Sequence, residues 1–187
     1  MRIPARAASV AALFAISATS LSGQGMVDKF GFVSRNGTVI DAAYAETGEF
    51  SDGLAAVAKE RGGPWGYIDK AGKMVIPERF KRANPFRNGV AFVRDKDDKS
   101  LIIDKRGKTI KELGDMYPSV ATMPGSDGPI PFASQRGLGY MTEKGDVVVP
   151  PAFEEADFFY EGLAAVRKGG KIGFIDPTGK MVIAPQF

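Results

Sequence analysis

The chain contains neither histidine nor cysteine, so the side chains that could do chemistry are mainly carboxylates and lysines. This excludes catalytic triads that use histidine, cysteine nucleophiles, and zinc sites built on either residue. A carboxylate-dependent hydrolase remains compatible with the composition, provided that two carboxyl groups lie about 5–10 Å apart in a cleft. The carboxylates to weigh are Asp69, Asp104 and Asp176, the group Glu154, Glu155 and Asp157, and the cluster Asp95, Asp97 and Asp98.

Asp69, Asp104 and Asp176 share one local setting, because each stands three residues before a glycine and between two apolar runs. A carboxylate at the first position of a tight turn accepts hydrogen bonds from the main chain. Capping of the turn therefore explains these three residues without any catalytic role.

The other two acidic groups also have structural explanations. The run "RDKDDK" that contains Asp95 offers clustered carboxylates of the kind that Ca²⁺ prefers, but it lacks the glycine and the distal glutamate of an EF-hand loop. Lys96 and Lys99 dilute its charge, so a solvated turn is the simpler interpretation. Glu154 and its neighbours are typical of an acidic loop surface. The sequence thus predicts no catalytic residue, no metal site and no cofactor.

One turn motif occurs five times along the chain. Each copy is an apolar run, then Ser, Asp or Thr, two further residues and Gly, then a second apolar run rich in β-branched and aromatic residues, which predicts two strands joined by a type I turn with a glycine bulge. The turn glycines are separated by 35, 35, 38 and 34 residues. The copies are "FGFVSRNGTVI" from Phe30, "WGYIDKAGKMVI" from Trp65, "SLIIDKRGKTI" from Ser100, "LGYMTEKGDVVV" from Leu138 and "IGFIDPTGKMVI" from Ile172, with glycines Gly37, Gly72, Gly107, Gly145 and Gly179.

A second block follows the turn, as in "PERFKRANPFRNGVAFV". Its aromatic residues and its glycine recur at similar places, which predicts a turn-like connector and then a third short strand. One such unit is too small to bury its own face, so several must stack. We therefore expect an all-β fold of about four and a half tandem β-meander or hairpin repeats of about 35 residues, in a curved array that is either open and solenoid-like or partly closed and propeller-like.

These blocks resemble the WG-repeat family, also called KWG repeats. Trp65, Gly66, Tyr67, Asp69 and Gly72 carry the family's first motif in full, whereas Ile172 replaces the tryptophan in the last copy and Ser100-Leu101 replaces Trp-Gly in the third. The resemblance implies interaction or cell-envelope roles and supplies no catalytic residue. The residues of the structural repeat motif are Trp65, Gly66, Tyr67, Asp69, Gly72, Asp104, Gly107, Gly139, Gly145, Gly173, Asp176 and Gly179.

The third unit departs most from the pattern. Its connector, "KELGDMYPSVATMPGSDGPIPFASQRG", carries extra residues and four prolines. Insertions in repeat proteins form loops on one face, often a binding face. The alternative is a drifted repeat with a loop that has no role in binding.

Residues 1–23 are typical of a cleaved signal peptide, and residues 24–187 form the repeat domain. Arg2 and Arg6 precede an apolar run that is too short to span a bilayer, and small residues follow it. Gln24 stands where a lipobox would need its cysteine. We therefore expect a secreted or periplasmic product without a lipid anchor or stable membrane insertion.

Removing the leader takes away two arginines and no acidic residue, so the formal net charge falls from +3 to +1. The remaining basic cluster of Arg79, Lys81, Arg82 and Arg87 is small, and we expect no binding of nucleic acid. The leading hypothesis is an exported, non-enzymatic module that recognises a protein partner. The alternatives are a cell-wall or glycan-binding module that uses Trp65, Tyr117 and Tyr160 and, behind it, the carboxylate hydrolase. Trp65 itself occupies a packing position in the repeat, which favours a core role over a sugar platform.

Overall fold

The structure is a computed structural model of the 187-residue chain, and it describes residues 13–22, 25–34, 39–119 and 127–187. The turn around Gly37, the first 12 residues of the predicted leader and part of the third connector lie outside the described residues. Within the described ranges every regular element is a strand. These residues contain no helix that is long and apolar enough to cross a membrane. The predicted all-β class is confirmed.

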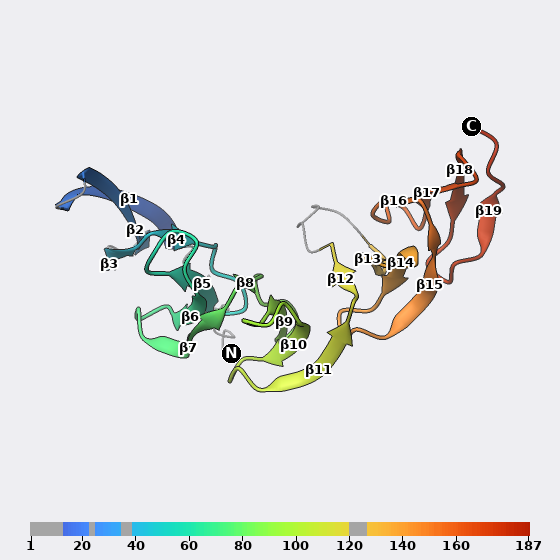
Figure 1. The fold of residues 1–187 in the computed structure, drawn as a ribbon. Coiled ribbons are helices and arrows are strands. Elements are labelled where there is room, and N and C mark those ends of the chain that lie inside the picture. The colour runs from blue at the N-terminus through green and yellow to red at the C-terminus, as the bar shows by residue number, and fades with distance from the viewer. Residues whose placement is uncertain (1–12, 23–24, 35–38, 120–126) are drawn as a thin grey trace, which may run out of the picture.

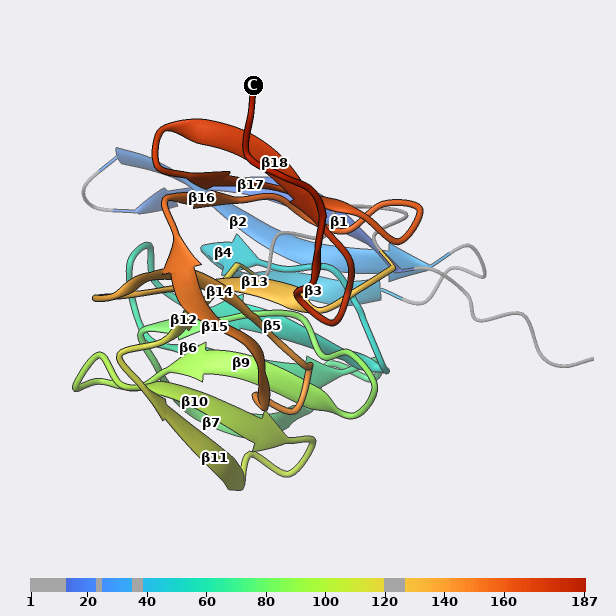
Figure 2. The same ribbon diagram turned by 90° about the vertical axis from the view of Figure 1, so that its right-hand side faces the viewer.

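The strands form five antiparallel sheets in chain order. In Figure 1 the sheets follow one another along an open arc, with β1–β3 at one end and β16–β19 at the other, and Figure 2 shows the same arc turned by 90°. The predicted tandem array is therefore confirmed in its open form. Sheet 1 holds β1 (Leu13–Ser22), β2 (Gly25–Ser34) and β3 (Val39–Tyr44); sheet 2 holds β4 (Glu46–Thr47), β5 (Leu54–Ala58), β6 (Trp65–Asp69) and β7 (Met74–Phe80); sheet 3 holds β8 (Arg82–Ala83), β9 (Val90–Arg94), β10 (Ser100–Asp104) and β11 (Thr109–Gly114); sheet 4 holds β12 (Tyr117–Pro118), β13 (Ile130–Ser134), β14 (Gly137–Met141) and β15 (Val147–Phe153); sheet 5 holds β16 (Glu155–Ala156), β17 (Ala164–Lys168), β18 (Lys171–Ile175) and β19 (Met181–Ile183).

The boundaries of the sheets do not coincide with the boundaries of the sequence units, because each unit contributes strands to two sheets. The two strands of one turn motif, β6 and β7, belong to sheet 2, whereas the connector and third strand of the same unit form β8 and β9 in sheet 3. The connector, predicted as a turn-like segment, contains a two-residue strand and a hairpin turn. Asn88 and Gly89 have φ angles of 48° and 83°, the pair of positive values that a type I′ turn requires. Each unit therefore links two sheets covalently.

The hydrophobic core is divided into clusters that lie between consecutive sheets. Val57 and Ile68 of sheet 2 pack with Phe32 of sheet 1, and Tyr140 of sheet 4 packs with Val166 of sheet 5. Two further clusters join sheets 2 and 3 and sheets 3 and 4 in the same way. No single sheet of this size buries enough apolar area to be stable, so stacking provides most of the stabilisation.

The repeated turn has the same geometry in each described copy. Asp69 Oδ1 accepts hydrogen bonds of 2.9 Å from the main-chain N–H groups of Ala71 and Lys73, and Gly72 has a φ of 77°. A Cβ atom at Gly72 would also lie 3.0 Å from Ile40 of the preceding sheet. The glycine thus closes the turn and docks it on the neighbouring sheet. Asp104, Thr142 and Asp176 cap the equivalent turns, which close at Gly107, Gly145 and Gly179.

Part of the predicted leader forms a strand in the full chain. β1 pairs antiparallel with β2, in a register that runs from Leu13 opposite Ser34 to Ser22 opposite Gly25. In sheet 1, β1 thus occupies the place beside β2 that β5 occupies beside β6 in sheet 2. Cleavage after residue 23 stays a prediction.

Candidate binding site

In two units of the array, a large residue near the start of the first strand of the turn motif is paired with a large residue at the end of the second strand. Trp65 is paired with Phe80 across β6 and β7, and Leu138 with Phe153 across β14 and β15. In the third unit the corresponding pair is Ser100 and Gly114. Both large residues are therefore missing at one position of the array.

A cavity of about 230 Å³ occupies this position. Ser100 alternates along β10 with Ile102, which packs on sheet 4, so both residues face the junction between sheets 3 and 4. Gly114 has a φ of 63°, and a Cβ atom built on it would meet no other atom within 4 Å. The cavity walls come from both sheets and consist of Arg82, Asn84, Phe92, Val93, Arg94, Ser100, Leu101, Leu113, Tyr117 and Pro118.

Ser100 places a buried polar group in the wall of the cavity. The residue is only 3% exposed, and its Oγ has no hydrogen-bond partner among the described residues. An unsatisfied buried hydroxyl costs about 1–3 kcal/mol. Rotation about χ1 can turn it toward the cavity, so a ligand that offers a hydrogen-bonding group would remove this cost.

Two arginines line the cavity from neighbouring strands. Arg82 in β8 and Arg94 in β9 are directly paired across the sheet, so their side chains project from the same face. The Arg94 guanidinium stacks over the ring of Tyr117, 4.0 Å from its centroid, and this links sheets 3 and 4. Like charges in directly opposite positions repel each other, so an anion between them would be favourable. The cavity wall itself contains no acidic side chain.

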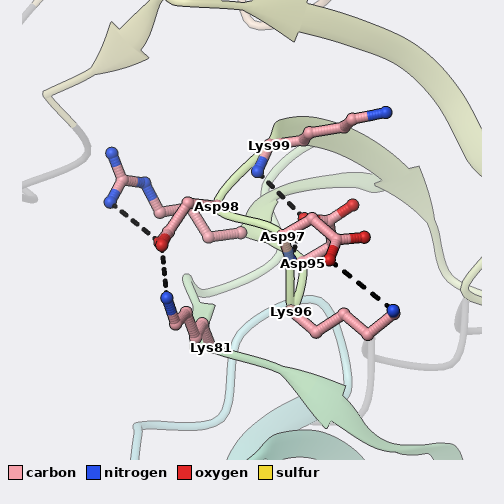
Figure 3. Close-up of polar contacts among 7 residues, drawn as sticks. Lys81, Asp95, Lys96, Asp97, Asp98 and Lys99 are labelled. Atoms are coloured by element: carbon pink, nitrogen blue, oxygen red, sulfur yellow. Dashed lines mark hydrogen bonds and ion pairs between the residues drawn. The ribbon is translucent and has the colours of Figure 1, made fainter.

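Asp98 is the carboxylate that lies near these arginines, and it is already bound by a lysine. Figure 3 shows Lys81 beside it. Lys81 donates a hydrogen bond to Oδ2, whereas the contact from Arg94 Nη1 to Oδ1 is 3.5 Å long. The hydrogen bond from Lys81, together with the charges of Lys81, Arg94 and Arg82, lowers the pKa of the Asp98 carboxyl. Two cations, Lys81 and Arg94, therefore contact the same carboxylate beside the cavity.

The cluster "RDKDDK" forms a turn between β9 and β10. Asp95 Oδ1 accepts hydrogen bonds of 2.9 Å from the N–H groups of Asp97 and Lys99, as Asp69 does in its own turn, and Asp98 takes the left-handed position with a φ of 62°. Asp97 pairs with Lys96 (Figure 3). The three carboxylates have separate partners, and the described residues contain no group of three or more potential metal ligands.

The second acidic group also binds locally. Glu154 accepts hydrogen bonds from the N–H groups of Gly169 and Gly170, and Glu155 pairs with Arg167 at 2.9 Å. These contacts hold the hairpin between β17 and β18. The three predicted acidic groups are thus dispersed over separate turns.

The remaining motif residues hold the repeat together. A Cβ at Gly66 would lie 2.6 Å from the Ile76 carbonyl oxygen, so β7 approaches Gly66 too closely for any side chain, and Gly139 and Gly173 have equivalent contacts with Val149 and Ile183. Trp65 is partly buried and packs on the cluster between sheets 2 and 3. Tyr67 is fully buried in the same cluster.

A comparison with protein-family models decides the affiliation of the chain. The model of the WG containing repeat matches residues 30–61, 65–99, 139–171 and 172–187. The chain belongs to the WG-repeat family. The matched segments leave out residues 100–138, the part of the WG-repeat array that contains Ser100, Gly114 and Tyr117. No curated protein matches the chain.

The cavity was not predicted from the sequence, although one of the two replacements that create it is visible there. The replacement of Trp-Gly by Ser100-Leu101 marks the third unit as unusual. The loss of the facing aromatic at Gly114 shows only in the strand register, because β10 and β11 pair with a shift that differs from the other units.

Proposed function

We propose that this WG-repeat protein is an exported, non-enzymatic binding module that recognises a protein partner in the cell envelope or outside the cell. The observation that carries the proposal is the cavity formed where Ser100 and Gly114 replace a large pair of side chains. A partly enclosed apolar hollow with a few polar groups is the usual form of a ligand site. Its position in the segment that departs from the family pattern supports a specialised role for the third unit.

The distribution of carboxylates supports a non-enzymatic role. The cavity at Ser100 has no carboxylate in its wall, and two further hollows on the array have one each, Glu143 and Asp157. A hydrolase of the carboxylate type needs two in the same cleft. The family pattern adds no catalytic residue.

Partner capture tests the proposal directly. The protein is purified, cross-linked in the envelope and extracellular fractions of its host, and analysed by mass spectrometry. Ser100→Trp fills the cavity with the residue that the second unit has at this position, and Ser100→Ala leaves it open. We expect one dominant protein that is recovered with the wild type and Ser100→Ala and lost with Ser100→Trp. Recovery that is the same for all three would contradict the proposal.

Export is tested by the mass of the protein isolated from its host. Removal of residues 1–23 would leave a chain that begins at Gln24, found in the periplasm or the medium. A chain with an intact N-terminus inside the cytoplasm would contradict export, whatever the capture experiment gives.

A glycan-binding role is the second candidate, and one hollow on sheet 5 favours it. This hollow has a volume of about 480 Å³ and is lined by Phe158, Tyr160 and Phe174 together with Asp157. Tyr160 is 40% exposed, which leaves its ring available for stacking on a sugar. Titration with cell-wall glycan fragments, with Tyr160→Ala as the matched variant, tests this role. Binding that survives this substitution, or no binding by the wild type, would exclude a site at Tyr160.

A further inference from the structure

The shape of the Ser100 cavity indicates what enters it. The hollow lies where the second unit has the indole of Trp65 and the phenyl ring of Phe80, and its buried apolar side chains are those of Phe92 and Leu113. Val93 and Leu101 also line it, but their side chains pack toward sheet 2. Phe92 and Leu113 are at most 8% exposed. The complementary group is therefore an apolar side chain, aromatic or large and aliphatic.

The charge at the mouth indicates what accompanies that side chain. The Arg94 guanidinium carbon lies 4.0 Å from the centroid of the Tyr117 ring, and this contact helps to hold a planar fork that can bind a two-oxygen acceptor. Arg82 stands beside it across the strand pair. The nearest carboxylate, Asp98, is held by Lys81 and touches Arg94 only at 3.5 Å. An incoming carboxylate would thus meet two guanidinium groups that are incompletely neutralised.

A second, smaller hollow lies next to the cavity. It shares Asn84 and Phe92 with the first and runs between β9 and sheet 4 to Ile130 and Glu143. Its volume is about 40 Å³, enough for a small part of a chain and not for a second large side chain. This neighbouring hollow favours an extended peptide over an isolated small acid.

We infer that the cavity binds the carboxyl-terminal residue of a partner protein, with its apolar side chain inside and its free carboxylate on Arg94 and Arg82. An apolar last residue brings the two groups together within one amino acid, and the cavity wall contains both kinds of partner. The Ser100 hydroxyl is then available to the main chain of the same residue. The inference rests on the proposed function and gives it a ligand.

Peptide binding tests the inference. The probe is a fluorescein-labelled hexapeptide that ends in phenylalanine with a free carboxylate, and fluorescence anisotropy measures its affinity for the purified protein. The same peptide with a carboxamide end removes the charge, and a peptide that ends in lysine removes the apolar side chain. We expect both control peptides to bind at least about tenfold more weakly. The carboxamide peptide loses a charge-assisted hydrogen bond, and the lysine peptide loses the burial of an apolar side chain.

Variants of the protein locate the binding. Arg94→Gln and Ser100→Trp are each expected to lower the affinity for the acid peptide at least about tenfold. Arg94→Lys keeps the charge and loses the planar fork, so its affinity should lie between those of these variants and the wild type. Because Ser100→Trp could unfold the protein, Ser100→Leu provides a second filling variant with the residue of the fourth unit. Far-ultraviolet circular dichroism checks each fold. Equal affinity of the acid and carboxamide peptides would overturn the inference.

Two further outcomes separate the inference from the function on which it rests. N-acetylphenylalanine competes weakly if a peptide is the ligand; if it binds as well as the hexapeptide, the site takes a small acid and the proposed protein terminus is wrong. Partner capture that depends on Ser100, combined with no affinity for any acid peptide, would retain the binding module and overturn its ligand. Failure of both experiments would remove the function itself.

Discussion

The hydroxyl of Tyr67 donates a 2.7 Å hydrogen bond to the main-chain carbonyl of Asn84, and this bond joins sheet 2 to sheet 3. Asn84 in turn lies in the wall of the Ser100 cavity and holds β9 through a bond from its Nδ2 to the Phe92 carbonyl. Tyr140 makes the equivalent bond to Asp157, at 2.8 Å, between sheets 4 and 5. Both buried tyrosines therefore link neighbouring sheets, and Tyr67 also supports a residue of the cavity wall.

Removal of this link should lower the stability of the array. Tyr67→Phe keeps the ring, which packs at 4.8 Å from Phe86, and leaves the Asn84 carbonyl without its side-chain donor. We expect the free energy of unfolding in urea to fall by about 1–3 kcal/mol. Tyr140→Phe should behave alike, whereas Tyr160→Phe, on an exposed ring, should change little. Equal stability of Tyr67→Phe and the wild type would show that the bond contributes nothing.

The same tyrosines predict sensitivity to alkali. Burial raises the pKa of Tyr67 and of Tyr140 above the ordinary value of 10.0. The unfolded chain thus loses these protons at lower pH than the folded chain, so their contribution is complete below about pH 10 and is lost as the pH rises further. Urea unfolding measured from pH 8 to pH 11 should show falling stability. The fall should be smaller in Tyr67→Phe, and an equal fall in both proteins would contradict the assignment.

The glycine that follows Trp65 is predicted to reject any side chain. In Gly66→Ala the new Cβ would lie 2.6 Å from the Ile76 carbonyl oxygen, so β7 must move away and part of the strand pairing is strained. We expect a loss of about 1–3 kcal/mol in the free energy of unfolding. Gly48→Ala is the matched control, because its nearest contact would be an ordinary 3.6 Å from Ala56. A stability near wild type for Gly66→Ala would mean that the close approach is unimportant.

The repeat was readable from the sequence because its determinants are local. The carboxylate of Asp69 and the positive φ of Gly72 act within five residues, so their spacing predicts the turn and the family pattern follows. The turn at Asn88-Gly89 is equally local and was open to the same reasoning, since that dipeptide is a strong hairpin signal. This turn lies within the connector and joins it to β9, the third strand of the unit, in sheet 3.

The cavity could not be read in this way, because it depends on pairing between strands. Gly114 follows Ser100 by 14 residues, whereas Phe80 follows Trp65 by 15, and only the register shows that the two pairs are equivalent. The arginines come from β8 and β9 and Tyr117 from the next sheet, so their meeting depends on how sheets stack.

Three aspartates should make the stability of the array depend on acid. Hydrogen bonds from Lys81, Lys111 and Thr178 lower the pKa values of Asp98, Asp146 and Asp176, respectively, below the ordinary value of 3.8. A depressed pKa means that the folded chain binds the proton less readily than the unfolded chain. The stability gained is therefore complete above about pH 5 and is lost as the pH falls through the lower folded values.

Replacement of the three aspartates tests this dependence. The variant Asp98→Asn, Asp146→Asn, Asp176→Asn should be less stable than the wild type at pH 7 in urea unfolding. At pH 2.5 the difference should be smaller, because the stability that the charged carboxylates contribute is lost as the pH falls. A deficit of the same size at both values of pH would assign the effect to packing and contradict the role of the charges.

Asp98 competes with a ligand for Arg94, and its removal should strengthen carboxylate binding. Asp98→Asn ends the pairing with Arg94 and Lys81 while asparagine tolerates the φ of 62° at this position. We expect the acid hexapeptide described above to bind more tightly to Asp98→Asn than to the wild type in fluorescence anisotropy, by up to about fivefold, because one competing charge near the guanidinium is lost. The gain should decrease as NaCl is raised, since exposed charges are screened.

The neighbouring aspartate provides the control for this prediction. Asp97→Asn removes the same charge from the same turn, but Asp97 pairs with Lys96 and does not contact Arg94. Its effect on affinity should therefore be smaller, and the difference between the two variants measures the local competition. If Asp98→Asn binds the acid peptide no more tightly than Asp97→Asn does, Arg94 is not the group that holds the carboxylate. Weaker binding by Asp98→Asn would indicate instead that Asp98 positions Arg94 for the ligand.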